Sequence, residues 1–197
     1  MKTFAALLFL TLCVTISFAQ NKYLPGFIIT PENDTIEGKI SDKIKPGAGK
    51  VKFIDSKGKK KTYYPRQIKG FAINDSIKYQ SILQTENAEA TAYHIFALLI
   101  SDGYYRLLAT KDKTRSLSKS TNDKKESGGY NFYIQESKTG KYFKLTKISY
   151  RNQLADLVGD FTELRREVRN KVYNYDEIPE VIEKYNGWKN EHVRVRP

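Results

Sequence analysis

The sequence contains one cysteine, Cys13, and it lies in the apolar stretch that opens the chain. We predict that this stretch is removed on export, so the mature protein has no thiol for a disulfide, a nucleophile or a metal ligand. Histidine is scarce as well, because only His94 and His192 are present and they are far apart in the sequence. Two isolated histidines without cysteine do not make the ligand set of a transition-metal site. We therefore expect no metal and no cofactor.

Long apolar runs are also lacking. The run Phe4–Ile16 is shorter than the ~20 apolar residues that a membrane-spanning helix needs. Lys2 precedes it and Ser17-Phe18-Ala19 follows it, as in a secretory signal peptide with a cleavage site of small residues. We predict a signal peptide over residues 1–19, and no transmembrane segment in the mature chain. An N-terminal membrane anchor is the alternative.

The absence of cysteine from the mature chain also indicates the compartment. Extracellular domains of eukaryotes usually carry disulfides, so export across a bacterial inner membrane explains a signal peptide without cysteine better. Leu12 precedes Cys13 where a lipoprotein signal needs a small residue, so we expect no lipid attachment. The sequence thus predicts an exported protein, either periplasmic or associated with the cell surface.

Catalytic motifs are missing. The chain has no HExxH sequence, no G-x-S-x-G elbow and no phosphate-binding or dinucleotide-binding loop. His94 lies in an apolar strand pattern, where a histidine of the core or edge is the simpler interpretation than a general base. We expect a non-enzymatic binding module of the cell envelope. The alternative is a small periplasmic hydrolase, which a pocket lined by His94 and two or more acids would favour.

Positive charge is abundant and uneven. The formal net charge is +12, and Lys39–Lys69 holds eleven Lys and Arg against two acids. Such a field attracts anionic partners, so we expect an envelope protein, a glycan or an anionic membrane surface. Export argues against nucleic acid. Lysines on solvated loops and strand faces are the alternative explanation.

Tyrosine is abundant too, with fourteen residues that include two adjacent pairs. Tyrosines on one exposed sheet face could stack on sugars or peptides. Alternatively, neighbours in a strand point to opposite faces, and only one of each pair is exposed. The candidate binding residues from charge and aromatic content are Lys57, Lys59, Lys60, Lys61, Tyr63, Tyr64, Arg66, Tyr104 and Tyr105.

The pattern of apolar and turn residues predicts the fold class. The longest apolar stretch of the mature chain, residues 93–109, is interrupted by Asp102-Gly103, which suits a type I′ hairpin turn between two strands. A helix over residues 86–99 is the alternative. Turn residues separate four further strand pairs, at 27–30 with 35–40, 50–55 with 61–64, 68–73 with 77–82, and 130–134 with 142–145. We predict an α+β protein with an antiparallel, β-rich domain over residues 20–147, arranged as a meander, sandwich or barrel-like sheet.

From Tyr150 the apolar period becomes helical, with Leu, Val and Phe spaced by three and four residues. We predict two short helices that bend at Gly159, with Asp160 and Glu163 forming a capping box. The acids of these helices should pair with their arginines. A final helix over 177–185 should stop at Asn186-Gly187, after which Trp188 packs back. The helical segment thus spans 148–188, residues 189–197 form a tail, and the polar segment 111–129 is a mobile loop.

Several of these segments together resemble a known family. They are Gly26-Phe27-Ile28-Ile29-Thr30, then Asp34-Thr35-Ile36-Glu37-Gly38-Lys39-Ile40, then Tyr64-Pro65 with Ile68-Lys69-Gly70-Phe71, and finally Tyr173, Ile178, Ile182 and Tyr185-Asn186. This succession is similar to secreted, β-rich proteins of uncharacterised function from Gram-negative bacteria. The matching residues are glycines, turn residues and core positions. The resemblance therefore implies a shared fold and an exported location, and it transfers no catalytic residue.

Overall fold

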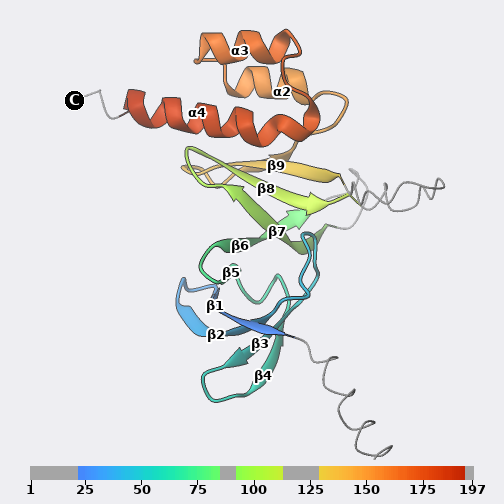
Figure 1. Cartoon of the computed structure of the whole chain (residues 1–197), viewed down its shortest axis with the longest axis vertical. Helices are drawn as coiled ribbons and strands as arrows, with labels where there is room; N and C mark the ends of the chain where they lie inside the picture. The colour runs from blue at the N-terminus through green and yellow to red at the C-terminus, as the bar shows by residue number, and fades with distance from the viewer. Residues whose placement is uncertain (1–21, 85–91, 113–128, 194–197) are drawn as a thin grey trace, which may run out of the picture.

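The structure is a computed structural model that describes residues 22–84, 92–112 and 129–193. The elements follow one another along the long axis of the molecule, with the first strands at one end and the helices at the other (Figure 1). The predicted signal peptide and most of the predicted mobile loop lie outside the described residues. Within the described part, no helix is both long enough and apolar enough to cross a membrane.

The described residues form one open antiparallel sheet of ten strands, which confirms the predicted α+β class. The strands are β1 (Tyr23–Ile29), β2 (Thr35–Ser41), β3 (Val51–Asp55), β4 (Lys60–Tyr63), β5 (Gly70–Ile73), β6 (Ile77–Gln84), β7 (Tyr93–Ser101), β8 (Tyr105–Lys111), β9 (Tyr130–Glu136) and β10 (Tyr142–Lys144). Their order across the sheet is β10-β9-β8-β7-β6-β5-β1-β2-β3-β4. All five predicted hairpins are present, and residues 93–101 are a strand rather than a helix.

The turn at Asp102-Gly103 is not of the predicted type. Neither residue has a positive φ; the two consecutive left-handed residues are Asn74 (φ 49°) and Asp75 (φ 56°), between β5 and β6. Gly103 is required for another reason, because a Cβ there would lie 2.6 Å from the side-chain amide of Asn186. The pairing of β7 with β8 shifts its register just before this turn.

The N-terminal strands curl around a core of their own, formed by Ile28, Ile40, Val51, Phe53, Ile68, Phe71, Ile73, Tyr79 and Phe96. Glycine allows β2 to approach β3 closely at this bend. A Cβ on Gly38 would lie 2.3 Å from the carbonyl oxygen of Ile54 and 2.4 Å from the ring of Phe53. Glycine inside a strand commonly marks such a close approach.

The helices cover the opposite end of the sheet. They are α2 (Tyr150–Leu157), α3 (Thr162–Arg169), the short 3₁₀ helix η3 (Tyr175–Glu177) and α4 (Ile178–Val193). Their buried side chains, such as Leu154, Leu164 and Ile182, form one cluster with Leu107 and Ile134 of the sheet. Two short helices after Tyr150 match the prediction.

Three details of the helical prediction are wrong. Phe161 occupies the N-cap of α3 and no side chain caps it; Asp160 accepts hydrogen bonds from Tyr185 (2.8 Å) and Lys189 instead. Helix α4 does not stop at Asn186-Gly187 but continues to Val193, so the first residues of the expected tail are helical.

The third detail concerns Asp160, which precedes α3, and Glu167 of α3. Among the ion pairs of the described residues, Glu167 and Asp160 are paired with Lys184 and Lys189 of α4, and not with the arginines of α3. These contacts are between helices rather than within one. The ring of Trp188 stacks on Phe161 with centroids 4.9 Å apart, so Trp188 packs back on the helices as predicted, from within α4.

Candidate functional site

The basic residues singled out from the sequence gather at the hairpin of β3 and β4. Its turn is held by the carboxylate of Asp55, which accepts hydrogen bonds from the backbone amides of Lys57 (3.0 Å) and Lys59 (2.9 Å). The amide of Lys59 has the largest effect on this carboxyl group. With the amide of Lys57 and the charge of Lys61, 3.6 Å away, it outweighs desolvation and lowers the pKa of Asp55.

The lysines of this hairpin do not all face the same way. Lys60 is opposite Ile54 and Lys61 is opposite Phe53, so the two point to different faces of the sheet. Lys61 is the one that pairs with Asp55. In the described part of the chain, Lys57, Lys59 and Lys60 form no ion pair, and all three are exposed. Their charges are therefore available to a partner at the tip of this hairpin.

The hairpin is also an edge of the sheet, because β4 has a partner on one side only. Lysines on an edge strand hinder pairing with another chain. Arg66 follows the strand and is exposed, and Tyr64 beside it is 52% exposed. Tyr63 is half-buried, with its ring edge-on to Phe53 at 5.9 Å. The structure thus brings together the basic candidates and one exposed tyrosine.

Tyr104 and Tyr105 lie far from this hairpin and pack against the helices. Tyr105 stacks on Tyr185 of α4 with centroids 5.4 Å apart, and the ammonium group of Lys189 lies 4.8 Å from the centre of the Tyr104 ring. Burial, followed by the neighbouring Tyr104 and the carboxylates of Glu136 and Asp160, raises the pKa of Tyr105 to about 12. These tyrosines pack against the helix-side core, whereas Tyr63 packs against the N-terminal core, so the two sets do not form one surface.

His94 lies in β7 opposite Leu83 of β6, and its Nδ1 atom is buried without a hydrogen-bond partner. No three residues of His, Cys, Asp or Glu in the described part of the chain are grouped as a metal site would require. A groove across the middle strands of the sheet is not lined by His94 either. Among the residues that the structure describes, His94 does not line an acidic pocket of the kind that would favour a hydrolase.

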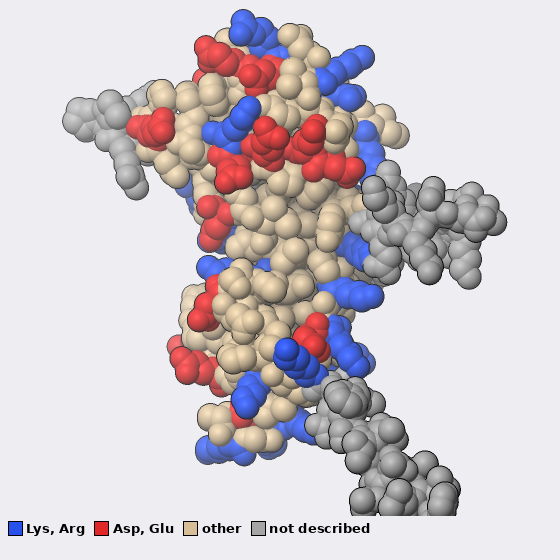
Figure 2. All heavy atoms as spheres, viewed as in Figure 1, with Lys and Arg blue, Asp and Glu red and all other residues tan. Residues whose placement is uncertain are grey.

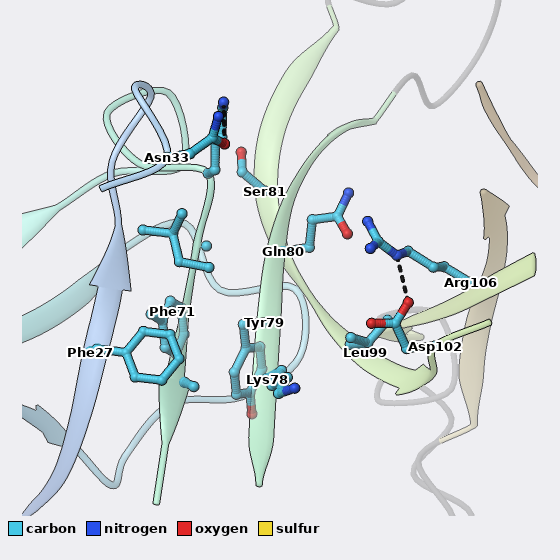
Figure 3. Close-up of a pocket in the computed structure, with 14 residues that line it drawn as sticks. Phe27, Asn33, Phe71, Lys78, Tyr79, Gln80, Ser81, Leu99, Asp102 and Arg106 are labelled. Carbon is cyan, nitrogen blue, oxygen red and sulfur yellow. Dashed lines mark hydrogen bonds and ion pairs between the residues drawn. The ribbon is translucent and has the colours of Figure 1, made fainter. Parts of the chain in front are cut away.

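That groove was not predicted from the sequence. It has a volume of about 430 Å³ and crosses β1, β5 and β6, with further contributions from β7 and the start of β8 (Figure 3). The register explains it, because Phe27 and Lys78 flank Ala72 in one row and Ile29 and Gln80 flank Gly70 in the next. Two small residues on β5 between larger neighbours leave a trough. The local sequence Gly70-Phe71-Ala72-Ile73 carries this signal, as an alternation of small and large side chains.

Charged groups surround the apolar floor of the groove. Lys69, Lys78 and Arg106 are its cations, and Asp102 is the one acid among the residues that line it. The Nε atom of Arg106 donates to Asp102 at 2.7 Å, and Lys69 donates to the side-chain oxygen of Asn33 at 2.6 Å. The groove combines apolar surface with an excess of positive charge.

Comparisons with protein-family models, with curated proteins and with solved structures find no match to this chain. The geometry therefore carries the functional argument.

Proposed function

We propose that this chain is an exported, non-enzymatic protein of the bacterial cell envelope that binds an anionic surface through the β3–β4 hairpin. The observation that carries the proposal is the separation of charge along the molecule. Residues 22–84 hold thirteen Lys and Arg against six acids, whereas residues 150–193 hold seven against nine. Figure 2 shows acidic side chains over the helices and basic ones around the strands at the other end.

Three exposed lysines make the hairpin the contact point of this proposal. Lys57, Lys59 and Lys60 project from a turn whose backbone is fixed by Asp55, so their charges are held together at one tip. An anionic membrane attracts each nearby lysine by about 1 kcal/mol, and three such lysines give binding that is measurable but reversible. The predicted signal peptide and the resemblance to secreted proteins support the proposed location.

Vesicle co-sedimentation tests the surface contact. Vesicles that contain phosphatidylglycerol should bind the protein at 0.1 M salt and lose it at 1 M, because the Debye length falls from ~10 Å to ~3 Å. Replacing Lys57, Lys59 and Lys60 by Gln should weaken binding by roughly two orders of magnitude, at about 1 kcal/mol per charge.

The matched control removes the same number of charges elsewhere. Lys138, Lys141 and Lys144 are exposed on the β9–β10 hairpin, at the other edge of the sheet. Their replacement by Gln should change binding far less. Equal losses in both triple variants would mean that only the net charge matters, and the proposed contact point would be wrong. Recovery of the protein from the cytoplasm with residues 1–19 intact would contradict the proposed location.

A further inference from the structure

We infer that the groove across β1, β5 and β6 is a binding site for a long-chain carboxylate, a molecule with an apolar chain and one anionic head group. Figure 3 shows the side chains that line it. The site is distinct from the β3–β4 hairpin and uses different residues. It stands whether or not the protein attaches to an anionic surface.

The floor of the groove suits an apolar chain. Phe27 and Ile29 of β1 and Leu99 of β7 are half-buried, so part of their surface faces the groove without a partner from the described residues. Between them, Gly70 and Ala72 contribute almost no side chain, which leaves a trough rather than a flat sheet face. Its volume of about 430 Å³ is in the range of small-molecule sites, which run from roughly 300 to 1,000 Å³.

The rim of the groove suits a carboxylate. Arg106 uses its Nε atom for Asp102, and the two terminal nitrogens of its guanidinium group point toward Gln80 and the groove (Figure 3). A guanidinium group presents parallel N–H donors that match the two oxygens of a carboxylate. The side-chain nitrogen of Gln80 donates to Gln135, so Gln80 offers the groove only its carbonyl oxygen, which is an acceptor. Arg106 is therefore the neighbouring group that can donate to an anion.

Charge complementarity sets the sign of the head group. Lys69 and Lys78 add to Arg106, whereas Asp102 is the single lining acid and is already paired. Within the described residues Lys78 has no ion pair. Three cations against one acid leave the lining with a net positive charge, so an anionic head group near Arg106 and Lys78 would be attracted and a cationic one repelled.

Calorimetric titration of the purified protein with dodecanoate, below its micelle concentration, tests the site. We expect saturable binding of one molecule per chain. Affinity should rise about threefold to fourfold for each methylene from octanoate to dodecanoate, as burial of apolar chain requires. Acetate should give no heat of binding, and dodecyltrimethylammonium should not compete, because it has the same chain with a positive head group.

Variants locate the head group. Arg106→Gln should weaken dodecanoate binding by about tenfold to a hundredfold, the range for loss of hydrogen bonds to a charged group. The exposed Arg106–Asp102 pair contributes little to folding, so this variant should keep the wild-type melting temperature. Arg166→Gln removes the same charge at an exposed position of α3, outside the groove, and should bind dodecanoate as the wild type does.

Three results would overturn the inference. They are an absence of dodecanoate binding, equal binding of the cationic and anionic chains, and equal weakening in Arg106→Gln and Arg166→Gln. A groove that instead accommodates a peptide segment would give the first of these results.

Discussion

Asn186 offers the sharpest test of how the helices are joined to the sheet. Its side-chain oxygen accepts the backbone amide of Tyr105 at 2.9 Å, and its nitrogen donates to the carbonyl oxygen of Tyr105 at 2.8 Å and to Ser101 at 3.2 Å. The paired registers of β7 and β8 end at Ser101 and Leu107. Tyr105 pairs with β9 on one side, and on its β7 side the side chain of a helical residue takes the place of a strand neighbour.

The cost of removing this amide follows from the groups that lose their partners. Asn186→Ala leaves the N–H and C=O groups of Tyr105 without a hydrogen bond at a position where Asn186 itself is only 6% exposed. Each unsatisfied buried group costs about 1–3 kcal/mol, and water that enters the space offsets part of this. We expect the free energy of unfolding to fall by about 3 kcal/mol. For a protein of this size the melting temperature should then fall by roughly 6–12 °C.

Thermal and urea denaturation of matched variants would measure this effect. Asn190→Ala, an exposed position one turn later in α4, should change the melting temperature little. Asn186→Asp keeps the size and the acceptor but loses the donor, so it should also be destabilised at neutral pH. A stable Asn186→Ala protein, or an Asn186→Asp protein as stable as the wild type, would refute the argument that both backbone groups of Tyr105 depend on this side chain.

Two further predictions concern pH and packing. Burial raises the pKa of Asp160, but hydrogen bonds from Lys189 and Tyr185 outweigh it and hold the pKa below 3.8. Its ionised form therefore stabilises the fold above that pH. Asp160→Asn should lower the melting temperature at pH 7 and match the wild type once the pH falls below the folded-state pKa. A difference in melting temperature that does not change with pH would contradict this. Gly38→Ala should lower the free energy of unfolding by about 2 kcal/mol or more, which is the usual cost of overpacking. The added methyl group would meet backbone and ring atoms of β3. Unchanged stability in urea denaturation would show that β2 and β3 can move apart to make room for it.

The parts of the fold that depend on local sequence could be predicted. The hairpins follow from turn residues between alternating apolar positions, and the basic tip at Lys57–Lys60 is contiguous in the chain. The end of α4 could not be predicted in this way. Asn186-Gly187 is a stop signal by local rules, but Asn186 is fixed by Tyr105, 81 residues earlier in the sequence, and the helix continues.

The groove could not be predicted because it depends on pairing between strands that are distant in the sequence. β1 lies between β5 and β2, so Phe27 and Ala72 are adjacent only after the chain returns past two hairpins. A single sequence gives the alternation of small and large residues in β5 but not the strand that flanks it. Arg106 likewise reaches the groove from β8, past β7 and β6. The sequence around it predicted a hairpin but not this contribution to a groove.

The charge separation along the molecule has an orientational consequence. The strands at one end carry the positive excess and the helices at the other the negative, so the charges of the described residues give an electric dipole moment along the long axis (Figures 1 and 2). Near any negatively charged plane this moment produces a torque as well as an attraction. The torque turns the β3–β4 hairpin toward the plane and makes the molecule stand upright, with α3 and α4 as the part farthest from the surface.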